Sequence, residues 1–247
     1  PRPPNPPPPG GGGNAWSPAS VRAMFDRIAP TYDLLNQLLS FNLDRGWRRR
    51  ACRFLPPGGR VLDLCGGTGD FSRASLSHWE RDRVRGEAVV VLDFSLPMLL
   101  RGRSRGTRPS LSWVQGDALN LPFPDASFDA ITCGFGMRNL GPQGTAPGLA
   151  EAFRVLKPGG RLVVLEFFPR LGKIRRLLQK TYLSGILPTL GGLISGDRGA
   201  YAYLSRTMEA YLDREAFEAA VDRAKLNRLA WEDLMGRLPG EGNLLIP

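Results

Sequence analysis

The chain has 247 residues, 42% of them hydrophobic, which is enough to bury the core of one α/β domain. Its formal net charge of +10 comes from 33 Lys and Arg against 23 Asp and Glu. The three cysteines, Cys52, Cys65 and Cys133, are odd in number, lack C-x-x-C spacing and have no histidine neighbours. This pattern argues against a disulfide framework and a zinc site, so we expect no metal and a reducing environment.

Basic residues gather in three clusters, at 45–53, 101–108 and 170–176. We expect no nucleic-acid partner, because these clusters contain few aromatic residues for base stacking and match no recognised motif. Two interpretations stay open, a solvated surface and peripheral contact with an anionic membrane surface. The longest uncharged stretch, 181–196, is shorter than the roughly 20 apolar residues that span a bilayer, so no transmembrane helix is expected.

Residues 1–20 are dominated by proline and glycine, and we predict a disordered tail there, followed by a single domain over 21–247. The chain begins at Pro1 instead of a methionine, so we expect its true N-terminus, with any targeting peptide, to be missing. Apolar residues at helical spacing predict one helix over 21–28 and a second over 34–39. These two helices precede the first strand and are expected to form a lid over a ligand cleft.

Strand and helix patterns then alternate along the chain, which predicts a parallel, doubly wound α/β sheet. The predicted strands cover residues 60–64, 87–93, 112–115, 128–133 and 161–166, and the predicted helices cover about 70–80, a segment from 95, 146–156 and 214–224. Such sheets bind ligands beyond the carboxyl ends of their strands, near the topological switch point. Residues 170–210 loosen this pattern and are interpreted as a helical insertion, where substrate recognition is often found.

A glycine-rich loop, Asp63-Leu-Cys-Gly-Gly-Thr-Gly69, joins the first predicted strand to the next helix. Glycine lets the backbone approach a ligand closely. The loop alone fits NAD, S-adenosylmethionine or a tight turn without a ligand, because dinucleotide-binding proteins have a related loop. Asp93, at the end of the second strand, suits either cofactor, since a carboxylate there can accept hydrogen bonds from both ribose hydroxyls.

Later segments favour S-adenosylmethionine. Asp117 and Ala118 follow the third strand, where a carboxylate beside a backbone N–H can pair with the adenine amine and ring nitrogen. Lys157-Pro-Gly-Gly160 forms the helix-turn-strand entry that is usual in methyltransferases, and no Tyr-x-x-x-Lys of an NAD oxidoreductase follows. We therefore predict a Rossmann-like class I S-adenosylmethionine-dependent methyltransferase. Its expected cofactor-binding residues are Asp63, Gly66, Gly67, Thr68, Gly69, Asp93, Phe94, Asp117, Ala118 and Gly134.

Two further motifs lie at residues 25–40 and at Gly134-Phe-Gly-Met-Arg-Asn139. They resemble the N-terminal signature and the F-G-x-R-N signature of the ubiquinone/menaquinone biosynthesis C-methyltransferase family. Residues 157–160 and 201–204 also match, so the similarity runs from about 21 to 222. The resemblance implies methylation of a ring carbon on a reduced, prenylated quinone. Residues 225–240 depart from the family pattern, so the resemblance does not extend to the closing wall of the quinone pocket.

Within that family, residues 27–32, 92–95 and 242–245 look closer to the plant and cyanobacterial phylloquinone branch. This resemblance implies demethylphylloquinol as acceptor and the chloroplast as location. Residues 66–69 and Glu166 look closer to the ubiquinone and menaquinone branch. A ubiquinone or menaquinone precursor therefore stays open as acceptor, and the mitochondrial matrix side of the inner membrane stays open as location. A methyltransferase for another small molecule and a non-catalytic scaffold of a quinone-biosynthesis complex are further alternatives.

A quinol offers an electron-rich carbon once a ring hydroxyl has lost its proton, and phenols have a pKa of about 10. We expect Arg138 to stabilise the phenolate by charge, Asn139 to orient it and Tyr32 to contribute from the lid. Hydrogen bonding within a turn and helix packing are equally open roles for these residues. His78 is expected on a helix surface away from the cleft, and residues 183–193 are expected either to line a prenyl channel or to belong to the core.

Overall fold

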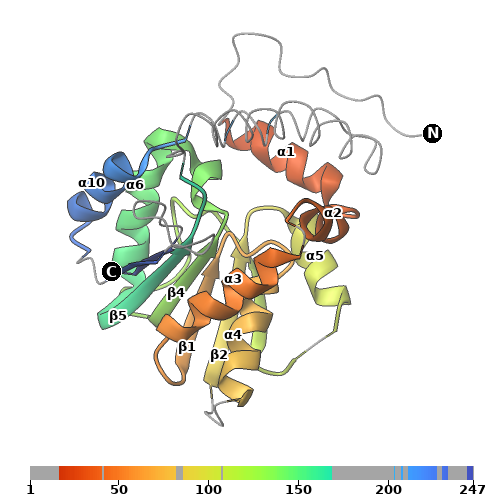
Figure 1. Ribbon diagram of the computed structural model, residues 1–247, viewed down its shortest axis with the longest axis horizontal. Helices are drawn as coiled ribbons and strands as arrows, with labels where there is room; N and C mark the ends of the chain where they lie inside the picture. The colour runs from red at the N-terminus through yellow and green to blue at the C-terminus, as the bar shows by residue number, and fades with distance from the viewer. Residues whose placement is uncertain are drawn as a thin grey trace.

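In the computed structural model, the described part of the chain comprises residues 17–40, 42–81, 86–106, 108–168, 203, 207, 211–226, 230–232 and 244–246. Its centre is a seven-stranded sheet in the order β3-β2-β1-β4-β5-β7-β6 (Figure 1). Strands β1 to β5 pair in parallel, and β7 runs antiparallel to β5 and β6. The strands are β1 (Gly59–Leu64), β2 (Gly86–Asp93), β3 (Leu111–Gln115), β4 (Phe128–Gly134), β5 (Leu156–Leu165), β6 (Ala230–Glu232) and β7 (Leu244–Ile246).

Helices cover both faces of this sheet, as the predicted doubly wound fold requires. Successive residues of β1 belong to different cores, because Leu62 and Leu64 pack under α6 and α10 whereas Val61 packs under α3 and α4. Strands buried on both faces need continuous apolar runs, and β2 supplies one. The covering helices are α3 (Leu43–Ala51), α4 (Asp70–Arg81) and α5 (Leu96–Ser104) on one face and α6 (Met137–Val155) and α10 (Arg214–Arg223) on the other.

The strand order reverses between β1 and β4. From β1 the chain builds outward through β2 to β3, then returns to place β4 on the other side of β1. The connections on the two sides leave in opposite directions at the carboxyl ends of these two neighbours, and this divergence opens the crevice in which α/β sheets bind ligands. The fold therefore brings the ends of β1, β2 and β4 to one place.

Two helices, α1 (Pro18–Ile28) and α2 (Tyr32–Leu39), lie across that edge of the sheet (Figure 1). Both were predicted from apolar spacing. Ser17 caps α1 by accepting the N–H of Ser20 at 3.4 Å, and Pro18 suits the first helical position because it needs no N–H partner there. This cap starts the helix at Pro18, three residues before the predicted start at Val21. Residues 1–16 lie outside the described part of the chain.

The structure differs from the prediction around α6. The helix was predicted over 146–156 because of the glycines and prolines before it, but it begins at Met137. Gly141 has non-helical angles (φ 70°, ψ 173°) and joins two helical pieces, so Pro142 stands at the start of the second piece, where proline is tolerated. The first piece carries the Arg138 and Asn139 side chains from the end of β4 toward the crevice region.

Four further elements were not predicted, and the 3₁₀ helix η1 (Cys52–Phe54) is one of them. Helix α3 was missed because its sequence is dominated by arginine, although Trp47 and Ala51 are buried. Strands β6 and β7 are short and were missed as well. The expected insertion at 170–210 and the apolar stretch 183–193 lie outside the described residues, apart from Tyr203 and Thr207. Among the helices that the structure describes, none is both long and apolar enough to cross a bilayer.

Candidate active site

Asp63 anchors the loop that follows β1. Its fully buried carboxylate accepts hydrogen bonds from Ser72 N (2.9 Å), Ser72 Oγ (2.5 Å) and Thr132 Oγ1 (3.0 Å). Burial raises the pKa of Asp63 to about 6, although these three bonds oppose the shift. The side chain therefore holds the first turn of α4 against β4, beneath the loop.

The glycines of the same loop serve two purposes. Gly67 has a φ angle of 56°, which glycine adopts without strain, and it borders the cavity described below. Gly66 and Gly69 are needed for packing, because a Cβ atom would lie 2.6 Å from Val91 Cγ1 at the first position and 2.7 Å from Trp113 Cη2 at the second. The loop therefore lies tightly against β2 and β3, and Gly67 borders the cavity.

Asp93 ends β2 beside this loop. Its Oδ2 accepts the N–H of Gly67 at 2.9 Å, and its Oδ1 accepts the N–H of Ser95 at 2.9 Å. The residue is 7% exposed, and burial raises its pKa to about 6 against the effect of these backbone bonds. Each carboxylate oxygen has a second lone pair, so Asp93 can also accept two ribose hydroxyls.

A cavity lies between the two lid helices and the carboxyl ends of the strands. It contains about 790 Å³ of space, including the part open to solvent. The predicted site residues that line it are Tyr32, Gly67, Asp93, Phe94, Asp117, Ala118, Gly134 and Asn139. The predicted site residues outside this lining are Asp63, Gly66, Thr68, Gly69 and Arg138.

Part of the lining was not predicted. These residues are Val21, Phe25, Cys65, Leu92, Met98, Gly116, Leu119, Phe135, Gly136 and Leu140. Most adjoin a predicted residue in the sequence, so their proximity to the motifs was the available signal. Phe25 comes from α1, and its ring contacts the edges of the Tyr32 ring at 6.2 Å and the Phe94 ring at 6.5 Å between centroids. The apolar face of the predicted first helix already contained Phe25.

Asp117 and Ala118 border the cavity after β3. Asp117 Oδ1 accepts the N–H of Leu119 at 2.9 Å, as in an Asx turn, and its Oδ2 has no protein partner in the described part of the chain. This carboxylate and the neighbouring backbone can recognise the amine and ring nitrogen of adenine, while Asp93 can hold a ribose. The donor set therefore fits S-adenosylmethionine, and Gly67 lets its chain approach the loop.

Arg138 is engaged in a buried ion pair. Its Nη1 lies 2.6 Å from Glu166 Oε1, and its backbone N–H donates to Glu166 Oε2 at 3.1 Å. Glu166 is fully buried and Arg138 is 8% exposed. The guanidinium also lies 5.7 Å from the centroid of the Phe135 ring. Glu166 therefore balances the positive charge of Arg138, which we expected to stabilise a phenolate. Arg138 lies beside Phe135 and not in the cavity lining.

Phe135 forms an aromatic wall of the cavity. It has a φ angle of 59°, unusual for a bulky residue, and its N–H donates to the Leu165 carbonyl at 2.7 Å. Its ring stacks on Phe167 with centroids 4.9 Å apart, and the Arg48 guanidinium lies 5.5 Å from its centroid. These contacts hold the ring in an orientation that the backbone alone disfavours.

Asn139 and Tyr32 bring polar groups to the cavity. Asn139 Nδ2 donates to the Phe135 carbonyl at 3.3 Å, which sets the direction of the amide. Its Oδ1 is buried and has no hydrogen-bond partner among the described residues, a condition that costs about 1–3 kcal/mol unless a ligand donates to it. Burial raises the pKa of Tyr32, so its phenol stays neutral at pH 7.

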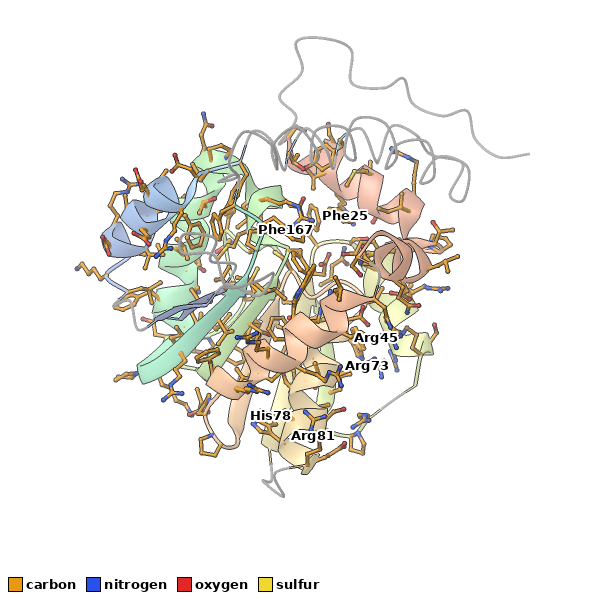
Figure 2. All side chains as sticks on the ribbon, in the orientation of Figure 1. Phe25, Arg45, Arg73, His78, Arg81 and Phe167 are labelled. Carbon is orange, nitrogen blue, oxygen red and sulfur yellow. The ribbon has the colours of Figure 1, made fainter. Side chains whose placement is uncertain are left out.

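His78 lies on α4, half-buried. Figure 2 shows it with Arg81 at the opposite end of the molecule from Phe25 and Phe167, which belong to the lid and the cavity region. This position agrees with the expected one on a helix surface away from the cleft.

The family model described as the "ubiE/COQ5 methyltransferase family" matches residues 15–238. The chain belongs to this family. A demethylmenaquinone methyltransferase of Thermus thermophilus is 46% identical over 81% of this chain and 90% of its own length. One of Deinococcus radiodurans is 44% identical over 79% and 80%. A ubiquinone/menaquinone biosynthesis C-methyltransferase of Paracoccus denitrificans is 38% identical over 87% and 85%. The chain is thus an S-adenosylmethionine-dependent C-methyltransferase of quinone biosynthesis.

Solved structures agree on the fold. A chain from the complex of the Haloferax volcanii Trm112 activator with a methyltransferase covers 92% of this chain and 96% of its own, with 21% identity and a TM-score of 0.61. The [4+2]-cyclase SpnF covers 87% of this chain and 74% of its own, with 20% identity and a TM-score of 0.60. Since a cyclase shares the architecture, the fold alone does not identify the reaction.

The ubiE/COQ5 relatives correct one expectation. Those reported above are bacterial, and further relatives come from Corynebacterium kroppenstedtii and Mycobacterium species. The chloroplast location inferred from the sequence was therefore wrong. The few residues that suggested the phylloquinone branch are outweighed by identity to bacterial enzymes over most of the chain.

The buried Asp63 carboxyl predicts a pH dependence of stability. Its pKa is about 6 in the folded protein and ordinarily 3.8, so the folded state binds the proton more tightly. This contribution to stability is complete below about pH 4 and lost as the pH rises through about 6, by about 3 kcal/mol. Asp63→Asn keeps one of the two acceptor oxygens, which can still accept the Ser72 bonds, and removes the titration.

The free energy of unfolding in urea would be measured for both proteins from pH 4 to pH 7. The variant should gain about 3 kcal/mol relative to the natural protein over this range. Asp125→Asn, at an exposed carboxylate, is the matched control and should show no comparable gain. A constant difference between Asp63→Asn and the natural protein at every pH would contradict the prediction.

Proposed function

We propose that the chain methylates a ring carbon of a reduced, prenylated naphthoquinone, demethylmenaquinol. The observation that carries this proposal is its identity to bacterial enzymes named demethylmenaquinone methyltransferase over about four fifths of its length. The aromatic cavity walls formed by Phe25, Phe94 and Phe135 support it, because they suit a flat fused ring. These relatives favour the menaquinone alternative over the phylloquinol acceptor that the sequence suggested.

We assign the methyl donor to the β1, β2 and β3 side of the cavity. Asp93 would accept the ribose hydroxyls, Asp117 and Ala118 would hold the adenine, and Gly67 with Gly134 would border the rest of the donor. S-adenosylmethionine supplies an electrophilic methyl group when bound. The residues of the chain orient the two reactants and exclude water, which contributes most where the reacting atoms must lie in line.

The acceptor must lose a phenolic proton before its ring carbon is sufficiently electron-rich. Asn139 Oδ1 would accept the hydrogen bond of a quinol hydroxyl and so fix the ring, which would relieve an unpaired buried acceptor. The neutral phenol of Tyr32 would donate to the oxygen that becomes phenolate. The Arg138–Glu166 pair would support Phe135 and Asn139 from the side instead of contacting the acceptor.

One alternative acceptor is carried by a specific observation. A ubiquinone precursor is the second acceptor, because the relative from Paracoccus denitrificans is named for both quinones. A non-catalytic scaffold is the alternative from another class, and no observation favours it. The cavity with Asp93, Asp117 and Asn139 in place argues against a scaffold.

An acceptor panel tests the proposal directly. Purified protein would be incubated with S-adenosylmethionine carrying a labelled methyl group and with chemically reduced demethylmenaquinol, demethylphylloquinol or a ubiquinol precursor. We expect label on a ring carbon of the naphthoquinols, identified by mass, and the highest kcat/KM with demethylmenaquinol. Oxidised quinones should remain unlabelled, because they lack the electron-rich carbon. Preferential labelling of the ubiquinol precursor would favour the alternative acceptor, and label on none would refute the proposal.

The role of Asn139 predicts a defect in the chemical step. Asn139→Ala removes the acceptor for the quinol hydroxyl, and kcat should fall by about 10²–10³ with little change in the affinity for S-adenosylhomocysteine. The matched control is Asn120→Ala, because Asn120 is exposed and outside the cavity lining. Rapid-quench kinetics under single turnover would separate chemistry from binding. An unchanged kcat in Asn139→Ala would remove the residue from the mechanism.

We also propose that the protein approaches its prenylated acceptor at an anionic lipid surface. Exposed leucines stand on three neighbouring helices, with exposed fractions of 50% for Leu34, 53% for Leu43 and 54% for Leu100. Arg45 and Arg49 are exposed on α3, the helix that also carries Leu43, and the acidic side chain of Asp44 on this helix is buried in an internal ion pair. Leucines and unbalanced arginines together suit the boundary of an anionic bilayer, at about 1 kcal/mol per arginine.

Vesicle flotation tests this surface. The protein should float with vesicles of phosphatidylglycerol and phosphatidylcholine, and the bound fraction should fall as salt rises. Arg45→Glu with Arg49→Glu should reduce binding severalfold. Arg223→Glu with Lys225→Glu on the opposite face of the sheet changes the net charge equally and should bind as before. Equal losses in the two variants would show attraction to total charge alone, contrary to a specific surface.

A further inference from the structure

Each lid helix forms a hydrogen bond close to the Asp93 carboxylate. In one case the bonded residue itself donates to Asp93, and in the other its neighbour in the chain does. On α1, Asp26 Oδ1 accepts the hydroxyl of Ser95 at 2.5 Å. The backbone N–H of the same Ser95 donates to Asp93 Oδ1 at 2.9 Å. One side chain of the lid therefore holds the residue whose amide orients one oxygen of the Asp93 carboxylate.

The second lid helix repeats this arrangement on the other oxygen. On α2, Asp33 Oδ1 accepts the hydroxyl of Thr68 at 2.7 Å. Thr68 follows Gly67, whose N–H donates to Asp93 Oδ2 at 2.9 Å. Each end of the Asp93 carboxylate is thus connected to a different lid helix through one loop residue or its neighbour.

The charge on Asp33, a side chain with only 8% exposure, is balanced locally by two arginines. Arg101 Nε lies 3.3 Å from its Oδ2, and Arg105 Nη1 lies 3.2 Å from its Oδ1. Arg105 also donates to Thr68 Oγ1 at 3.2 Å and to Asp70 Oδ1 at 2.7 Å. The contact between lid and loop is therefore a network of charge-assisted bonds, in which each member fixes the others.

We propose that Asp26 and Asp33 are positioning residues that couple the lid to methyl-donor binding by holding Ser95 and Thr68. We call these two contacts the lid clamp. A donor ribose on Asp93 stabilises the carboxylate orientation that the clamp also stabilises. Coupling of this kind is reciprocal, so the clamp tightens donor binding and the donor orders the lid by the same factor. The inference depends on donor binding and is independent of which quinol is the acceptor.

The Asp33 half of the clamp can be tested by calorimetry with S-adenosylhomocysteine, which needs no acceptor. Thr68→Val removes the hydroxyl at nearly constant shape, and Asp33→Ala removes its partner. Each variant should weaken binding by about 5- to 50-fold. The double variant should bind S-adenosylhomocysteine with about the affinity of the single variant that binds it less tightly, because both changes break the same connection. Thr68→Ser, which keeps a hydroxyl, should restore most of the affinity.

Glu80→Gln is the control, because it breaks another ion pair, with Arg108, at the far end of α4 from the loop. It should bind S-adenosylhomocysteine as the natural protein does. Additive losses in Asp33→Ala and Thr68→Val, or equal losses in the control, would overturn the clamp and leave an ordinary packing contact. Asp26→Ala tests the other half in the same way.

Hydrogen exchange gives a second test, carried out on the natural protein and then on Thr68→Val. Saturating S-adenosylhomocysteine should slow amide exchange across residues 18–39. None of the residues that we assign to the methyl donor lies in this segment, so the protection would be transmitted through the clamp. Thr68→Val should lose most of this protection at equal saturation. Exchange in 18–39 that is unaffected by the ligand would overturn the proposal, whatever the acceptor assays show.

Discussion

The fully buried carboxylate of Asp63 is the interaction on which the rest of the site depends. It lies where the strand order reverses, and its three hydrogen bonds join β1, the start of α4 and β4. A buried carboxylate is expensive, and its pKa near 6 reflects that cost. These bonds fix the direction in which the loop that starts at Cys65 leaves the sheet. The N–H of Gly67 therefore reaches Asp93, and this side of the cavity is held in place.

The fold was largely predictable because its signals are local. Apolar runs such as β2, a glycine-rich turn and a helical apolar face each identify an element from adjacent residues. The donor side of the cavity was predictable for the same reason, since Asp93 and Gly134 end strands, Asp117 follows the end of β3 by two residues, and parallel strands end at one edge. Helix α3 escaped prediction because arginines on its exposed face hide the buried Trp47 and Ala51.

The part that sequence reasoning could not reach consists of long-range side-chain pairing. Arg138 looked available for a phenolate, and only the folded chain shows its partner Glu166, directly after the neighbouring strand β5. Thr68 looked like a ligand contact, yet its hydroxyl is donated to Asp33, 35 positions away. In both cases residue type and spacing indicated a polar role correctly, while the identity of the partner depended on tertiary packing.

The strained backbone of Phe135 has a consequence for the chemistry of the cavity. A phenylalanine at φ 59° persists because Phe167, Arg48 and Arg138 surround its ring and its amide is bonded to Leu165. The same residue offers its carbonyl to Asn139 and its ring to the cavity, so one peptide unit orients both the polar and the aromatic walls. Substitutions that change the selectivity for quinones would therefore have to preserve this backbone bend. Side chains that adapt the cavity to rings of different size are confined to the opposite wall, which the lid forms.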